Sequence, residues 1–180
     1  MSPSIREEID RLDVAVYAAV AKTPTPRLDS AMSGLSSAAD YSRISLVTAG
    51  LLATSGPSGR RAAKRGLVAL GLTAAVVNAV IKPLAGRRRP DAAAAAVPIA
   101  RRVEMPRSAS FPSGHSAGAF AFAGGVGREL PWAGGAMAVV ATTVAYSRVH
   151  TGVHYPGDVI AGAVCGLTGV AAAERVLRRR

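Results

Sequence analysis

Three polar stretches of this chain combine the side chains that could hold a phosphate group and react with it. They are Lys82–Pro90, Pro112–His115 and Ser147–Asp158, and all three histidines of the chain lie between residues 115 and 154. Fixed cations can neutralise a phosphoryl group, one imidazole can attack phosphorus, and another can protonate the leaving oxygen. The clustering therefore predicts one site for chemistry on a phosphate.

The last stretch holds a candidate nucleophile. His154 and Asp158 are four residues apart. At that distance a carboxylate can accept from one imidazole nitrogen and leave the other as a neutral, oriented nucleophile. His115 would then supply the proton to the departing alkoxide. His150 is interpreted as a loop residue beside the site, with a supporting or structural place.

Other residues of these stretches are predicted to bind the phosphate. Lys82, Arg89 and Arg148 each lie near the end of a predicted helix and could surround the phosphoryl oxygens. Ser113 is a good N-cap for a helix starting near His115, and Gly114 allows a ligand to approach the backbone. A helix N-terminus adds free N–H groups and a positive dipole end.

The rest of the chain consists largely of apolar segments that predict the scaffold of the site. Five segments carry no formal charge: Ile44–Gly59, Gly66–Ile81, Ser108–Gly127, Leu130–Ser147 and Val159–Ala173. Each approaches the roughly 20 residues that a membrane span requires. We predict an all-α, polytopic transmembrane bundle of about five to six helices in a single domain, 1–180, and we reject a soluble helical bundle.

The first 27 residues differ from the remainder. Ile9, Leu12, Val16 and Val20 repeat at helical spacing among charged residues, which predicts an amphipathic helix on the membrane or against the bundle. Thr23–Pro26 should end it. The transmembrane catalytic core then covers residues 28–180, with a second helix from about Leu28 to Ser55. Pro131 and Pro156 should each open a helix.

The charge pattern points to membranes and anionic substrates. The formal net charge is +11, and only three of the 22 basic residues are lysines. The arginines flank apolar runs and no nucleic-acid motif is present, so nucleic acid is excluded as a partner. Arg87 and Arg88 are interpreted as membrane-edge residues that snorkel. No spacing of Cys and His suggests a metal site, and Cys165 should be a packed apolar residue.

The distribution of basic residues also predicts an orientation. Arg60–Arg65 and the tail Arg178–Arg180 should be cytoplasmic. The number of spans between them places Pro83–Pro112 and Val149–Gly157 together on the non-cytoplasmic face, with the active site. Gly- and Ala-rich helix faces can also associate, so a homo-oligomer stays open.

The three stretches resemble the signature of the type 2 phosphatidic acid phosphatase superfamily, which includes lipid phosphate phosphatases and vanadium haloperoxidases. That signature reads Lys-x6-Arg-Pro, Pro-Ser-Gly-His and Ser-Arg-x5-His-x3-Asp. Every defining position is matched in order: Lys82, Arg89, Pro90, Pro112, Ser113, Gly114, His115, Ser147, Arg148, His154 and Asp158.

The resemblance implies a metal-independent membrane phosphatase without a cofactor, acting on a lipid phosphate. It gives His154 the role of nucleophile that forms a phosphohistidine, Asp158 that of its orienting partner, and His115 that of general acid and then base. Glycerolipid and polyprenyl phosphates are candidate substrates. The Ala- and Arg-rich, Lys-poor composition suits a GC-rich genome. If the source is an actinobacterium, a cell-wall polyprenyl substrate such as decaprenylphosphoryl-5-phosphoribose is a candidate. The alternatives are a vanadium-dependent haloperoxidase and a non-enzymatic protein that binds anionic lipid.

Overall fold

The computed structural model describes residues 4–179, which form helices and loops without a strand. This confirms the all-α prediction. The helices are α1 (Ile5–Lys22), α2 (Pro26–Ala38), α3 (Arg43–Thr54), α4 (Pro57–Val76), α5 (Lys82–Ala85), α6 (Gly114–Gly127), α7 (Pro131–His150) and α8 (Pro156–Arg178). Short helical turns are η1 (Asp40–Ser42), η2 (Val77–Ile81) and η3 (Ile99–Arg101).

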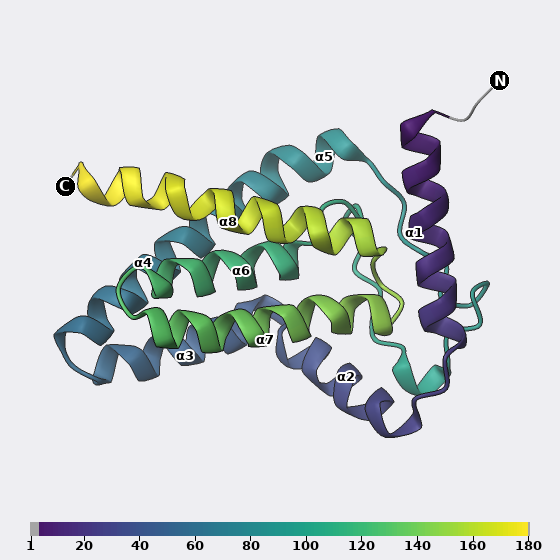
Figure 1. Cartoon of the computed structure of the whole chain (residues 1–180), viewed down its shortest axis with the longest axis horizontal. Helices are drawn as coiled ribbons and strands as arrows, with labels where there is room; N and C mark the ends of the chain where they lie inside the picture. The colour runs from purple at the N-terminus through teal and green to yellow at the C-terminus, as the bar shows by residue number, and fades with distance from the viewer. Residues whose placement is uncertain (1–3, 180) are drawn as a thin grey trace.

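Helix α6 forms the centre of the bundle. It packs against α4, α7 and α8, and Ala121, Phe122 and Val126 of α6 are fully buried. Figure 1 shows α6, α7 and α8 running side by side, with α4 crossing behind them and α1 standing across one end. The loops that precede α6 and α8 meet at the end of the bundle nearest α1, so the three polar stretches meet there too.

A close contact between α8 and α6 fixes the relative position of these two helix starts. Gly162 of α8 lies so near α6 that an added Cβ would come within 2.5 Å of the Ser113 carbonyl oxygen. The backbone N–H of Ser113 in turn donates to the Asp158 carbonyl oxygen at 2.9 Å. Glycine is therefore required where the two backbones touch, and the contact keeps His115 and Asp158 in register.

Several predicted helix boundaries agree with the structure. α1 ends before Thr23, and Pro131 and Pro156 each occupy the first turn of a helix. The predicted single helix from Leu28 to Ser55 is wrong. It breaks at Tyr41 and Ser42, whose φ angles are 54° and 58°, and α3 begins only at Arg43. This left-handed backbone interrupts the helical hydrogen bonds and turns α3 away from α2.

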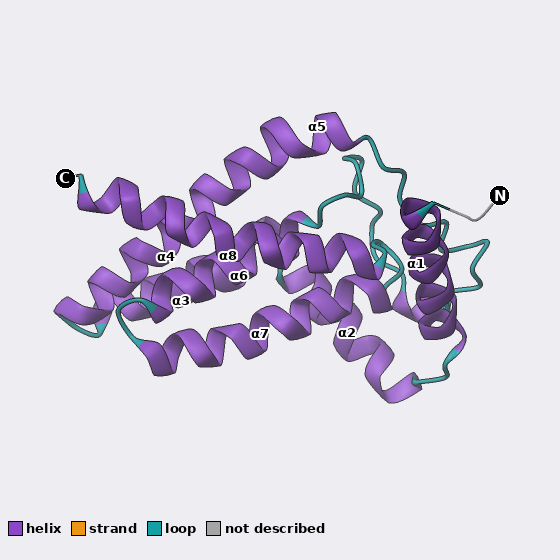
Figure 2. Ribbon diagram, turned by 45° about the horizontal axis from the view of Figure 1, so that its top comes forward, coloured by secondary structure: helices purple, strands orange, loops and turns teal. Residues whose placement is uncertain are grey.

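In α1 the exposed and buried faces are partly reversed relative to a helix that packs its apolar face into a core. Its buried side chains are Asp13, Tyr17 and Ala21, whereas Ile9 and Leu12 are exposed. Figure 2 shows α1 at the edge of the molecule, crossing the end of the bundle. The Asp13 carboxylate therefore faces the protein. Ile9, Leu12 and Val16 of the apolar stripe face away from it, whereas Val20 is partly buried against the cluster that contains Tyr17.

Within residues 4–179, two helical segments are long and apolar enough to cross a membrane, Pro57–Ala85 and Pro156–Arg178. The first comprises α4, η2 and α5 as one continuous rod. The predicted span Ile44–Gly59 does not form one helix, because the chain turns at Ser55 and Gly56 between α3 and α4. At about 1.5 Å per residue, the 12 residues of α3 measure roughly 18 Å.

Candidate active site

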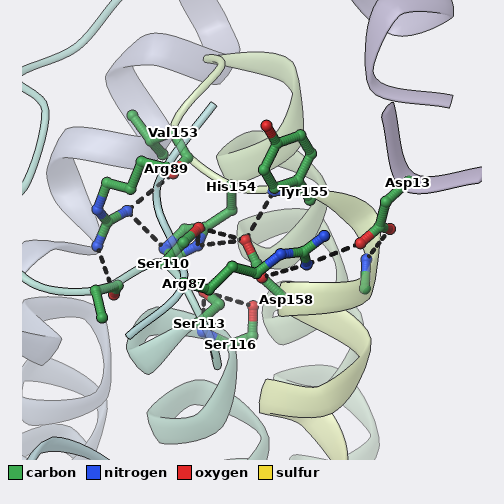
Figure 3. Close-up of polar contacts among 12 residues, drawn as sticks. Asp13, Arg87, Arg89, Ser110, Ser113, Ser116, Val153, His154, Tyr155 and Asp158 are labelled. Carbon is green, nitrogen blue, oxygen red and sulfur yellow. Dashed lines mark hydrogen bonds and ion pairs between the residues drawn. The ribbon is translucent and has the colours of Figure 1, made fainter. Parts of the chain in front are cut away.

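His154 and Asp158 face each other in the loop and first turn that begin α8. His154 Nδ1 lies 3.3 Å from Asp158 Oδ2, and both side chains are buried. The same carboxylate oxygen accepts from the Tyr155 backbone N–H at 2.9 Å and from the Ser110 hydroxyl. These bonds anchor Oδ2, and Figure 3 shows this oxygen of Asp158 on the side of the His154 ring.

The other nitrogen of His154 points toward Arg89. Arg89 Nη1 lies 3.1 Å from His154 Nε2 and donates to the Val153 carbonyl oxygen at 2.8 Å. Because an arginine can only donate, the bond assigns a free lone pair to Nε2 and the proton to Nδ1, toward Asp158. Burial lowers the pKa of the imidazole from 6.5 to about 4; Asp158 opposes this shift and Arg89 reinforces it. The ring is therefore neutral at pH 7, as a nucleophile must be.

Lys82 and Arg89 converge on one hydroxyl group. Ser108 Oγ accepts from Lys82 Nζ at 3.1 Å and from Arg89 Nη2 at 3.3 Å. Lys82 directly follows the π-helical turn η2, and an extra residue in a turn rotates the side chains after it by about 100°. Its ammonium group consequently lies over Gly114, where an added Cβ would be 3.5 Å from Nζ.

His115 has a carboxylate partner of its own. Its Nε2 lies 2.8 Å from Asp40 Oδ1, and Arg148 Nη1 lies 3.6 Å from the same oxygen. Arg148 Nη1 also donates to Ser36 Oγ at 2.6 Å. Asp40 thus links the candidate proton donor to one of the candidate phosphate-binding cations.

A cavity of about 250 Å³ joins these groups. Its lining includes Lys82, Arg89, Gly114, His115 and His154. Pockets for drug-sized ligands are typically about 300–1,000 Å³, so this one matches a phosphorylated head group better than a whole lipid. The two histidines and two of the predicted cations therefore share one water-accessible space.

Two predicted phosphate-binding residues lie outside that lining. Ser113 is fully buried and acts as the N-cap of α6, because its hydroxyl oxygen accepts a hydrogen bond from the Ser116 backbone N–H. The Ser116 hydroxyl also donates to Ser113 Oγ at 3.2 Å. Arg148 is also buried, and its Nε has no partner among the described residues. Ser113 directly precedes the lining residue Gly114 in the sequence, and Arg148 is connected to the lining residue His115 through Asp40.

The structure adds polar residues that the sequence alone did not single out. They are Ser108, Ser110 and Asp40, none of which belongs to a recognisable spacing. The interpretation of Arg87 as a snorkelling membrane-edge residue is wrong. Its Nη1 donates to Asp158 Oδ1 at 2.9 Å, 71 residues away in sequence, and only Arg88 of the pair is exposed.

The helical fold and the two histidines, the lysine and the arginine around one cavity agree with the signature that the sequence resembles. Residues 64–180 match the PAP2 superfamily model. The chain belongs to the PAP2 superfamily, and it is a phosphatase hydrolase that resides in a membrane.

Similar proteins are found among both sequences and solved structures. The decaprenylphosphoryl-5-phosphoribose phosphatase of Mycobacterium tuberculosis is 37% identical over 171 residues, which is 90% of this chain and 89% of that protein. The crystal structure of a transmembrane PAP2-type phosphatidylglycerolphosphate phosphatase from Bacillus subtilis has a TM-score of 0.72 and 24% identity, covering 96% of this chain and 87% of the other. The crystal structure of Aquifex aeolicus LpxE has a TM-score of 0.70 and 21% sequence identity, and the match covers 91% of this chain and 95% of that chain.

Proposed function

We propose that this protein removes the terminal phosphate from a polyprenyl-linked phosphosugar, through a phosphohistidine on His154. The observation that carries the mechanism is the neutral, buried imidazole held between Asp158 and Arg89 at the wall of the cavity. The substrate class is supported by the similarity to a decaprenylphosphoryl-5-phosphoribose phosphatase over nearly the whole chain. Such a substrate is a phosphomonoester, so its leaving group is a sugar alkoxide.

The first chemical step uses the groups on the cavity wall. The incoming phosphate draws the Arg89 N–H groups to its own oxygens and so frees the lone pair on His154 Nε2. Nε2 attacks phosphorus, the phosphorus–oxygen bond breaks, and His115 gives its proton to the alkoxide. Lys82, Arg89 and Arg148 neutralise the charge on the phosphoryl oxygens, and the N-terminus of α6 at Ser113 and Gly114 adds its dipole.

The second step returns the enzyme to its starting state. His115, now neutral, takes a proton from water as the water oxygen attacks phosphorus, and the phosphorus–nitrogen bond to His154 breaks. Asp158 stabilises the positive charge on the phosphorylated imidazole. No step calls for a metal ion, because the fixed cations supply the charge that a metal would supply.

The proposed arrangement in the membrane places the site on the non-cytoplasmic face of a multi-pass bundle. The end of the bundle opposite the site carries the basic segment Arg60–Arg65 and, at the end of α8, Arg178 and Arg179 (Figure 1). Part of that segment is internally paired, since Arg61 Nε lies 2.7 Å from Glu129 Oε1. The exposed apolar stripe of α1 supports an interfacial position for residues 1–27, with 28–180 as the catalytic core.

Phosphate release from a panel of lipid phosphates tests this proposal. Wild type and His154→Ala are compared in detergent, with decaprenylphosphoryl-5-phosphoribose, phosphatidic acid, phosphatidylglycerol phosphate and a polyprenyl diphosphate as substrates. We expect the polyprenyl phosphosugar to give the highest kcat/KM. His154→Ala should lower it by at least about 1,000-fold, because the attacking group is gone.

His150→Gln is the matched control, because His150 is as buried as His154. Of these two histidines, only His154 belongs to the described lining of the cavity. His150→Gln should retain wild-type turnover, and chelators should change the turnover of neither this variant nor the wild type. Turnover by His154→Ala would disprove the nucleophile assignment. Halide oxidation in the presence of vanadate and peroxide would instead favour the haloperoxidase alternative, whereas inhibition by vanadate alone agrees with a phosphatase.

A further inference from the structure

Arg87 lies on the side of Asp158 that faces away from His154. While Asp158 Oδ2 faces the imidazole, Oδ1 receives Arg87 Nη1 at 2.9 Å. The same Nη1 lies 2.8 Å from Asp13 Oδ2, and Nη2 lies 2.9 Å from Asp10 Oδ1. Figure 3 shows the guanidinium between the two carboxylates, Asp158 and Asp13. Arg87 is therefore the element that connects α1 to the nucleophile's partner.

Asp13 is a polar residue buried on the protein-facing side of α1. Its second oxygen, Oδ1, accepts from the Gly157 backbone N–H at 2.6 Å, at the very start of α8. An added Cβ on Gly157 would come within 2.6 Å of the Asp13 carboxylate, so the glycine leaves the room that this contact needs. Asp13 thus satisfies a free N–H group of the helix that carries Asp158.

Aromatic packing reinforces the same junction. The Arg87 guanidinium lies 4.6 Å from the centre of the Tyr155 ring, and Tyr155 meets Tyr17 of α1 edge to face at 5.5 Å. Tyr17 also donates to the Gly152 carbonyl oxygen at 3.2 Å. The loop that carries His154 is consequently held by α1 at both of its ends.

We propose that Arg87 and Asp13 are positioning residues, which hold Asp158 in the orientation that His154 needs and so make α1 part of the catalytic apparatus. The proposal rests on the function proposed above, because it presumes that His154 is the nucleophile. The described residues that line the cavity include neither Arg87 nor Asp13. Their effect on the reaction passes through Asp158.

The physical basis is the complete burial of Asp158. A buried carboxylate needs partners for both oxygens, and removing one leaves a charge that is costly and free to rotate. Without Arg87, Oδ1 would lose its ion-pair partner, so the Asp158 carboxylate could rotate and would attract a proton onto His154 more strongly. Asp10 is exposed, and its surface ion pair should contribute little.

The test compares Arg87→Gln and Asp13→Asn with Arg88→Gln, a neighbouring exposed arginine, in the full-length protein. We expect the first two variants to lower kcat on the order of 10–100-fold, the usual size when a partner behind a functional imidazole is lost. KM should change little, because the cavity lining is intact. Arg88→Gln should stay within about twofold of wild type.

A second readout separates positioning from general loss of structure. The charged groups that face His154 are Asp158 of α8, Arg89 of the preceding loop and Arg148 of α7. With Arg87 removed, Asp158 attracts the imidazolium more strongly, so the His154 pKa should rise above about 4. The acid limb of the kcat/KM–pH profile should then move to higher pH. Histidine ¹⁵N NMR should show the same rise in the His154 pKa in the absence of substrate. Arg87→Lys should recover part of both effects.

Wild-type kcat and an unmoved His154 titration in folded Arg87→Gln and Asp13→Asn would overturn the proposal. A loss of activity that Arg87→Lys does not relieve, with the titration unmoved, would also overturn it. An inactive wild type would refute the proposed function instead, and the NMR titration would still decide whether Arg87 and Asp13 control His154.

Discussion

Two buried clusters in this protein contain the same three residue types, and only one of them borders the cavity. In the first, His154 lies between Asp158 at 3.3 Å and Arg89 at 3.1 Å. In the second, Asp29 Oδ1 receives Arg101 Nε at 2.8 Å and lies 3.1 Å from His150 Nε2. Both imidazoles are almost fully buried.

The arginines show what separates the clusters. Arg101 donates to the carbonyl oxygens of Val20 and Thr23 and to the Thr25 hydroxyl as well as to Asp29, so it fastens the α1–α2 corner to η3. Asp29 in turn connects this corner to α7 through His150. Arg89 instead lines the cavity together with His154. Residue type and burial therefore do not identify a reactive site; a histidine lone pair that a ligand can reach does.

Asp158→Asn should produce the largest difference between the two clusters. An amide can present its NH₂ group to the ring and cannot stabilise the positive charge of a phosphorylated imidazole. We expect kcat to fall by about 10⁴-fold, the size known for losing the carboxylate behind a catalytic histidine. Phosphate release and circular dichroism would be measured on the same preparation.

Asp29→Asn is the control for that variant. It makes the same chemical change in the second cluster, and it should weaken the fold while leaving kcat within a few-fold of wild type. Comparable losses of kcat in both variants would mean that the clusters do not differ in function.

Local patterns in the sequence predicted much of the scaffold. Helix starts at Pro131 and Pro156 and the end of α1 at Thr23 follow from residues next to each other, and the structure confirms them. The break at Tyr41 and Ser42 could not be predicted, because neither residue favours left-handed backbone by itself. The contacts of Asp40 with His115 and Arg148 accompany this unfavourable geometry.

The candidate site was predictable to the extent that its residues form short motifs. Lys82, Arg89, His115 and His154 indeed meet at one cavity, while their chemical roles stay predictions. The contacts of Arg87 with Asp13 and of Arg101 with Asp29 join residues more than 70 positions apart. Such pairs depend on how the helices pack, which no spacing in one sequence encodes.

Arg101→Gln should separate stability from catalysis in the second cluster. Removing one partner of a buried ion pair typically costs about 3–5 kcal/mol, because the remaining charge is left uncompensated. We expect the free energy of unfolding in detergent to fall by about that amount, while kcat per folded molecule stays within about twofold. An intact fold with a large loss of kcat would contradict the structural role given to this cluster.

The smallest expected effects concern pH and His150. A proton on Nε2 removes the lone pair that attacks phosphorus, so activity is present above the His154 pKa and is lost as pH falls through about 4. The acid limb of kcat/KM, which reports the free enzyme, should therefore lie near pH 4 rather than near 6.5. His150→Gln should leave that limb in place and lower the free energy of unfolding by only about 1 kcal/mol, for one weakened hydrogen bond. If the acid limb moved in the His150→Gln variant, the two clusters would titrate together. The distinction between a reactive and a structural histidine would then rest on geometry alone, without support from proton binding.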